Sequence, residues 1–194
     1  MNHSPRDPHL PTPQIIILNG VGSVGKSSTA KAFQAISAQP FLHVAMDSFI
    51  EMLPSRLLGD PQGLVFETFQ ADGKPSVAIT TGPAFERMMT GMRRSIAALA
   101  GAGNSLIVDD VMIEQGEAQE YRSLLAEYEV RFVGLFAPLE VLEARELARG
   151  DRAVGLARWQ FDRVHQGVDY DLEVDTANST PVEVAQRIAQ AFGL

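Results

Sequence analysis

Residues 14–28 read QIIILNGVGSVGKSS, and this stretch decides the fold of the chain. The unbroken apolar run at residues 15–18 is typical of a parallel strand that is covered on both faces. The glycines that follow end the strand, and a helix is predicted over residues 25–38. A buried strand that leads through a glycine-rich turn into a helix indicates an α/β fold with a parallel sheet.

The glycine-rich turn fits the phosphate-loop pattern G-x-x-x-x-G-K-[ST]. Its glycines allow a tight turn whose N–H groups, with the helix N-terminus, form a cradle for anions. Lys26 is expected to contact the terminal phosphates, and the Ser27 hydroxyl to bind Mg²⁺. The pattern therefore predicts ATP and Mg²⁺ as cofactors. The residues predicted to bind the nucleotide are Gly20, Val21, Gly22, Ser23, Val24, Gly25, Lys26, Ser27 and Ser28.

The same glycines also fit G-x-G-x-x-G, the pattern of dinucleotide-binding folds, and Asp47 lies near the ribose-binding position of such a fold. A dinucleotide fold needs close helix–strand packing after the third glycine and has no role for a Lys-Ser pair there. Lys26 and Ser27 therefore favour the phosphate loop.

Further elements alternate along the chain. Strands are predicted at 42–46, 105–108, 130–136 and 172–174, and helices just after Asp47 and at 83–100, 118–128, 138–149, 154–165 and 181–192. Residues 57–83 are rich in Gly, Pro and Asp and read as irregular, with a small hairpin at 65–69 and 77–79. This alternation predicts a three-layer P-loop NTPase fold with a five-stranded parallel sheet and right-handed crossovers.

Length and composition limit the class of protein. The chain has 194 residues, which predicts one domain over 14–194 after a disordered, proline-rich lead-in at 1–13. A net charge of −8 disfavours nucleic acid as a partner. The chain has no cysteine, which excludes disulfides and thiolate zinc sites. No apolar run approaches the ~20 residues of a membrane helix, so we expect a cytoplasmic protein without membrane contact. The oligomeric state stays open.

Acidic residues follow two predicted strands, at the edge where ligands bind in open α/β sheets. Asp47 is the candidate to orient an acceptor hydroxyl and accept its proton. It could also cap the helix that follows, and the two roles are compatible. Asp109 and Asp110 come next to each other, so only one is expected to face the metal. We favour Asp109 for the metal and Asp110 for the substrate side.

An arginine-rich segment is the third candidate feature. Arg145 and Arg149 share one helix face, and Arg152 follows Gly150, which offers a hinge. Such a segment, at about residues 145–158, could be a lid that closes over phosphates. It could equally be a solvated helix with ion pairs between neighbouring turns. The substrate region is expected at about residues 48–92, where Met88 lies on a helix that could line an apolar pocket or pack in the core.

Several segments resemble chloramphenicol phosphotransferase, and together they span nearly the whole chain after Pro13. They are IIILNG at 15–20, the phosphate loop, DSFIE at 47–51, VDDV at 108–111, EARELARGDR at 143–152 and VHQGVDYDLEVDT at 164–176. The phosphate loop alone is shared by many families, whereas the other segments in this order are much more specific.

The resemblance implies a fold like that of nucleotide and shikimate kinases, and ATP- and Mg²⁺-dependent phosphorylation of a primary hydroxyl on chloramphenicol. It also implies that Asp47 is the catalytic base and that the arginine segment, with Arg149 and Arg152, is a lid. Residues 21–24 and 57–83 depart from the family pattern. The partner could therefore be another small alcohol. A nucleotide-dependent switch protein is the alternative class, although no guanine-reading Asn-Lys-x-Asp segment is present.

Overall fold

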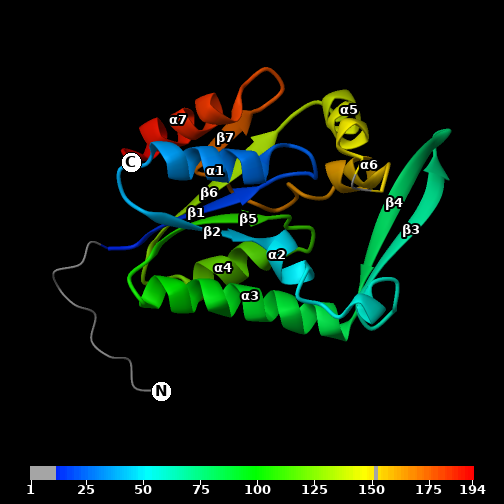
Figure 1. The fold of residues 1–194 in the computed structure, drawn as a ribbon, viewed down its shortest axis with the longest axis horizontal. Coiled ribbons are helices and arrows are strands. Elements are labelled where there is room, and N and C mark those ends of the chain that lie inside the picture. Colours follow the sequence, from blue (N-terminus) through cyan, green and yellow to red (C-terminus); the bar gives the residue numbers. More distant parts are fainter. Residues whose placement is uncertain (1–11, 151–152) are drawn as a thin grey trace.

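A five-stranded parallel sheet forms the centre of the protein in the computed structural model, which describes residues 12–150 and 153–194 (Figure 1). Its strand order is β2 (Phe41–Ala45), β5 (Ser105–Asp110), β1 (Gln14–Asn19), β6 (Glu129–Phe136) and β7 (Leu172–Asp175). The five predicted strands are all present, and the predicted α/β fold class is confirmed.

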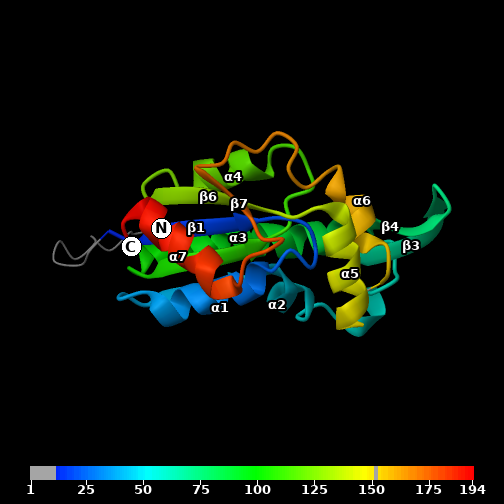
Figure 2. The ribbon, with the colours of Figure 1, turned by 90° about the horizontal axis from the view of Figure 1, so that it is seen from above.

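Helices cover both faces of the sheet (Figures 1 and 2). One layer contains α1 (Lys26–Ile36) and α7 (Pro181–Phe192), and the other contains α3 (Pro83–Gly101) and α4 (Glu117–Leu124). Three further helices and one 3-10 turn lie near the carboxyl ends of the strands: α2 (Met46–Ile50), η1 (Ser55–Leu57), α5 (Leu139–Arg149) and α6 (Leu156–Phe161).

The apolar run of β1 is continuous because both of its faces are buried. Ile16 and Leu18 pack in the core on the side of α1 and α7, whereas Ile15 and Ile17 pack in the core on the side of α3 and α4. All four side chains are fully buried. Side chains alternate along a strand, so a strand covered on both faces needs apolar residues at every position.

Residues 57–83 are more regular than the sequence analysis predicts. They contain a two-stranded antiparallel hairpin of β3 (Leu64–Ala71) and β4 (Lys74–Thr81), so the predicted hairpin at 65–69 and 77–79 is confirmed, and its strands are longer than predicted. The turn residues Asp72 and Gly73 both have positive φ angles, of 51° and 75°. Asp-Gly is a strong signal for a two-residue hairpin turn, and it could have been used to find the full length of both strands.

The hairpin extends from the body of the protein beside α6 (Figures 1 and 2). The backbone N–H of Val77 donates to the carbonyl of Gly155, at 3.1 Å, and so joins β4 to the segment before α6. A Cβ atom at Gly155 would lie 2.5 Å from the carbonyl oxygen of Pro75. Glycine is therefore required where the two segments meet.

The helix predicted at 154–165 is shorter in the structure. Helix α6 ends at Phe161, and hydrogen-bonded turns continue the chain. Most of the predicted lead-in at 1–13 lies outside the described residues. Within the described ranges, no helix has the length and apolarity that a membrane span requires.

A substitution at Gly20 tests how closely the phosphate loop packs against β6. A Cβ atom there would lie 2.7 Å from the carbonyl oxygen of Leu135 and 2.9 Å from a methyl carbon of Val24, whereas Gly91 in α3 has open space. We expect Gly20→Ala to lower the free energy of unfolding by about 1–3 kcal/mol, because backbone must shift. Gly91→Ala, the control, should raise it by about 0.5–1 kcal/mol. Chemical denaturation measures both, and unchanged stability of Gly20→Ala would contradict this close packing.

Candidate active site

The phosphate loop connects β1 to α1 through two residues with positive φ angles. Ser23 has a φ of 65°, and Gly25, the N-cap of α1, has a φ of 104°. These conformations keep the loop out of helix and strand, so that its backbone can curl around an anion. The ammonium group of Lys26 lies against the loop itself, where it donates to the carbonyls of Gly20, at 2.8 Å, and Val21, at 3.3 Å.

Distant segments hold the loop at two points. The Thr176 hydroxyl donates to the carbonyl of Val24, at 2.9 Å. The N–H of Gly22 donates to the side-chain oxygen of Gln160, at 2.7 Å. The first contact joins residues that are 152 positions apart in the sequence, and the second joins residues that are 138 positions apart.

Ser27 and Asp109 lie side by side at the start of α1 and the end of β5. The Ser27 hydroxyl donates to Asp109 Oδ2 at 2.5 Å. His43 Nε2 lies 3.7 Å from the same oxygen, too far for a hydrogen bond. Burial acts to raise the pKa of Asp109, but His43, Lys26 and the Ser27 hydrogen bond together hold it below its usual value. Asp109 is therefore a carboxylate at neutral pH.

Asp110 lies on the opposite face of β5, as expected for consecutive strand residues. Its carboxylate accepts from the Tyr121 hydroxyl, at 2.7 Å, and from the N–H of Val111, at 2.8 Å. Burial raises its pKa against the effect of these hydrogen bonds. Asp110 lines neither of the cavities described next, so its contacts are with the core beneath α4.

Two cavities meet at the carboxyl edge of the sheet. The smaller, of about 60 Å³, is lined by residues of the phosphate loop together with Asp109. The larger, of about 570 Å³, lies between α2, the hairpin, α3 and α6. Four residues line both cavities and so mark their junction: Met46, Asp47, Val111 and Arg149. Asp47 is in the first turn of α2, and α2 has no side-chain hydrogen bond at its N-cap, Ala45.

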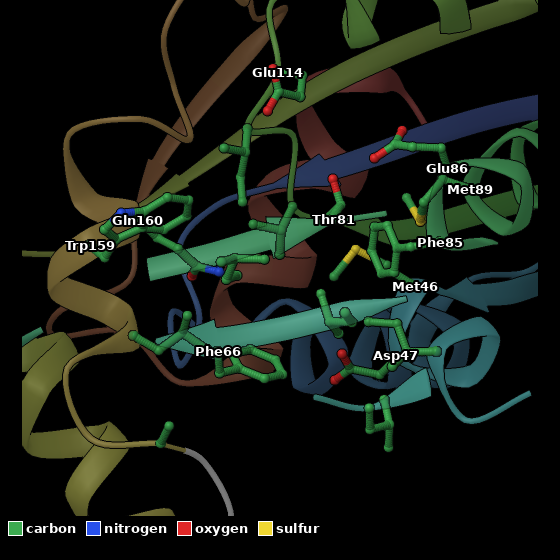
Figure 3. A pocket seen from close by; sticks show the side chains of 18 of the residues that line it. Met46, Asp47, Phe66, Thr81, Phe85, Glu86, Met89, Glu114, Trp159 and Gln160 are labelled. Carbon is green, nitrogen blue, oxygen red and sulfur yellow. The ribbon is translucent and has the colours of Figure 1, made fainter. Parts of the chain in front are cut away.

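The larger cavity has apolar walls with acidic side chains among them (Figure 3). The apolar walls include Met46, Phe66, Phe85, Met89, Leu156 and Trp159. The acidic residues are Asp47, Glu51, Glu86, Glu114 and Glu117, and Arg149 is the one basic residue among the described residues of the lining.

Glu117 differs from the other acidic residues of this lining. It forms an ion pair with the buried Arg93 and accepts from the N–H groups of Ile113 and Glu114, both at 2.8 Å. Burial and the charge of Asp110 raise its pKa to about 7. Glu117 is therefore engaged within the wall of the cavity.

The residues around the smaller cavity fit a magnesium ion. Mg²⁺ is commonly held by one or two protein oxygen ligands, and its other ligands are water and phosphate oxygens. The Ser27 hydroxyl and the Asp109 carboxylate are such oxygens, and both line the cavity that the loop encloses. In the part of the chain that the structure describes, no group of three or more acidic or histidine residues forms a metal cluster.

The two arginines of α5 have different surroundings. Arg149 lines both cavities. Arg145 donates to the carbonyls of Thr176, at 2.7 Å, and Ala177, at 3.3 Å, and lines neither cavity. Arg152 lies outside the described residues. On α3, Met89 lines the larger cavity and the predicted Met88 does not.

Three buried polar residues near the site were not predicted from the sequence. Gln160 binds the loop at Gly22. Glu146 accepts from the N–H groups of Gly155, at 2.7 Å, and Ala157, at 2.8 Å, and so provides hydrogen-bond acceptors for backbone N–H groups at the start of α6. Asn19 accepts from the N–H of Met112, at 2.9 Å. An Asn directly before the first glycine of the loop is a local signal, but the partners of Gln160 and Glu146 follow only from the fold.

A small aromatic network lies behind the loop. His165 stacks on Phe136 with 3.9 Å between ring centres, and its Nδ1 lies 2.7 Å from the Tyr170 hydroxyl. Asn19 Nδ2 donates to the same hydroxyl at 2.7 Å, which leaves the hydroxyl hydrogen for His165. Burial and the charge of Lys26 lower the pKa of His165 to about 4. His165 is therefore neutral at neutral pH.

The sequence matches a known protein family and two curated proteins. A family model described as "Chloramphenicol phosphotransferase-like protein" matches residues 13–193. Two proteins from strains of Mycobacterium tuberculosis, each named "Putative O-phosphotransferase", are 31% identical to this chain over 189 residues, which is 94% of this chain and 84% of theirs.

Solved structures of kinases share the fold. The APS kinase CysC of Mycobacterium tuberculosis, in complex with AMPPNP and APS, superposes with a TM-score of 0.64 at 15% identity and covers 95% of this chain and 99% of its own. An unliganded sugar kinase from Janibacter sp. superposes with a TM-score of 0.59 at 20% identity, with 94% and 95% covered. The sheet and its helices therefore form a P-loop kinase fold.

The lowered pKa of His165 predicts a pH dependence of stability. In the unfolded chain His165 binds a proton with its ordinary pKa of 6.5, whereas in the folded protein its pKa is about 4. Stability from this group is therefore present above pH 6.5 and is lost as the pH falls toward 4. We expect the melting temperature to fall more steeply between pH 6.5 and 4.5 for the wild type than for His165→Gln. Parallel melting curves across this range would contradict the neutral, buried imidazole.

Proposed function

The chain belongs to the chloramphenicol phosphotransferase-like family and is a phosphotransferase with the P-loop kinase fold; from this premise we propose that it transfers the γ-phosphoryl group of ATP to a hydroxyl of a small molecule. The first candidate for the acceptor is chloramphenicol, and a role in antibiotic resistance would follow from it. The use of ATP also favours the cytoplasm as its compartment.

One observation carries this proposal: the Asp47 side chain borders both cavities, at the junction between the phosphate loop and the larger cavity. A hydroxyl bound in the larger cavity would meet the terminal phosphate at this junction. Phosphoryl transfer needs a carboxylate there to orient the hydroxyl and accept its proton. A protein that only binds nucleotide as a switch has no need of a second cavity of about 570 Å³ beside the loop.

The proposed reaction is an in-line transfer. The acceptor oxygen forms a bond to the γ-phosphorus while the bond from that phosphorus to the β–γ bridging oxygen breaks, and its proton passes to Asp47. ADP leaves with the bridging oxygen. Lys26, now directed at Gly20 and Val21, would turn to the β- and γ-phosphates. A magnesium ion held by Ser27 and Asp109 would neutralise charge on these phosphates.

Arg149 is the part of the proposed lid with the strongest support. It lines both cavities from the end of α5, and Gly150 follows it with a left-handed φ of 68°. A guanidinium at this junction would stabilise charge on the transferred group. Arg145, by contrast, joins α5 to the 176–177 loop and also donates to the carbonyl of Val24, at 3.5 Å, so its contribution to nucleotide binding would be to position the phosphate loop.

The acidic lining favours an acceptor without negative charge. Glu51, Glu86 and Glu114 line the larger cavity with Asp47, and the phosphates of ATP would add more negative charge beside them. A carboxylate or phosphate on the acceptor would meet repulsion there. Chloramphenicol-like neutral alcohols with an apolar body suit the remaining walls, which include Phe66, Phe85 and Trp159.

A screen of alcohols tests the class of acceptor. We expect an ATP-dependent mass gain of one phosphoryl group with chloramphenicol or another neutral or cationic alcohol. Sugar acids and sugar phosphates should show none, because the lining is acidic. Mass spectrometry after incubation with Mg-ATP is the measurement. Turnover of anionic acceptors alone would contradict the proposed class of acceptor. Turnover of a neutral alcohol but not of chloramphenicol would reject only the assignment of chloramphenicol as the acceptor.

Substitution of Asp47 tests the proposed base. Asp47→Asn removes the proton acceptor at the junction, and we expect kcat to fall by about 10²–10⁴-fold. Calorimetry should find the affinity for Mg-ATP little changed. Asp72→Asn is the control, because Asp72 lies at the tip of the hairpin and lines neither cavity. Wild-type turnover by Asp47→Asn would reject this role.

A further inference from the structure

Gln160 lies between the larger cavity and the phosphate loop. Its side chain is 3% exposed and lines the larger cavity from α6 (Figure 3). Its oxygen accepts from the N–H of Gly22, at 2.7 Å, and Gly22 lines the smaller cavity. One planar group therefore forms the boundary between the phosphate loop and the proposed acceptor site.

The contact with Gly22 fixes the orientation of the Gln160 carboxamide. A carboxamide has one acceptor end, the oxygen, and one donor end, the NH₂ group. A backbone N–H can pair only with the oxygen. The NH₂ end is therefore turned away from the Gly22 nitrogen, and it can donate two hydrogen bonds.

Neither segment is held in place by this contact alone. The start of α6 is already fixed by Glu146, which accepts from the N–H groups of Gly155 and Ala157 and is 2% exposed. The loop is held separately by the Thr176 hydroxyl at the carbonyl of Val24. A buried amide that serves only packing would be a costly choice, because each polar end needs a partner.

We propose that Gln160 is a catalytic residue whose NH₂ group donates a hydrogen bond to the phosphoryl group as it passes between the two cavities. This inference rests on the proposed function. A donor fixed beforehand at the place where charge develops stabilises the transition state more than the bound substrates. Gln160 is fixed through Gly22, so the loop that binds the phosphates also orients the donor.

The test uses the complex of Mg-ADP with aluminium fluoride, which mimics the phosphoryl group in transfer and requires no identified acceptor. Calorimetry measures the affinity of the full chain for Mg-ADP with and without fluoride. The quantity compared is the gain in affinity that aluminium fluoride gives over Mg-ADP alone. We expect this gain to be at least about tenfold smaller in Gln160→Glu and in Gln160→Met than in the wild type. Gln166→Met, on the exposed turn after α6, is the control and should behave as wild type.

The two substitutions separate a catalytic donor from a structural clamp. Glutamate keeps an oxygen for the N–H of Gly22 but removes the donor, whereas methionine removes both. A structural clamp predicts that each variant changes the affinity for both complexes by the same factor. That result would overturn the inference. If Gln160→Met does not fold, Gln160→Glu alone decides.

The same measurement keeps the two proposals apart. Wild-type protein that does not bind Mg-ADP would overturn the proposed function, and the role of Gln160 with it. Wild-type protein that binds Mg-ADP and gains affinity with fluoride, together with variants that gain just as much, would overturn the role of Gln160 alone.

Discussion

The site depends on one constraint: the backbone between β1 and α1 must leave its N–H groups outside regular structure and must still keep one conformation. The residues that turn the chain, Ser23 and Gly25, have positive φ angles, which regular helices and strands do not allow. Within the loop, Lys26 donates to the carbonyls of Gly20 and Val21, and the Val24 N–H donates to the carbonyl of Val21. Hydrogen bonds from Thr176 and to Gln160 then join the loop to the rest of the protein, and both residues come from the last third of the chain.

The alternation of side chains along β5 gives two neighbouring carboxylates opposite environments. Asp109 faces α1 and has a lowered pKa, because burial is outweighed by His43, Lys26 and Ser27, which together stabilise its charge. Asp110 faces α4 and has a raised pKa, because its burial outweighs the hydrogen bonds from Tyr121 and Val111. Only the first lines the smaller cavity, as a metal ligand there must. A shift of one residue in the register of β5 would exchange them.

Local patterns predicted the elements that depend on local causes. The sequence predicted the apolar run of β1, the positions of the five sheet strands along the chain and the loop at Gly20–Ser27. The hairpin was underestimated because its strands alternate apolar and polar residues only weakly, although Asp72-Gly73 marked its turn. Contacts such as Gly22 to Gln160 could not be predicted, because they join segments far apart in the chain and only the packing of α6 brings them together.

Two acidic residues of α5 join this helix to neighbouring elements. The sequence allowed ion pairs between neighbouring turns of one helix, but Glu143 pairs with Arg158 and Lys74, and Glu146 accepts from the backbone at the start of α6. Lys74 belongs to β4, and β4 also binds α6 through Val77 and Gly155. Helices α5 and α6 and the hairpin are therefore joined by charge and by backbone hydrogen bonds. A displacement of α5 that moves Arg149 must also displace α6, and with it Gln160 and the wall of the larger cavity.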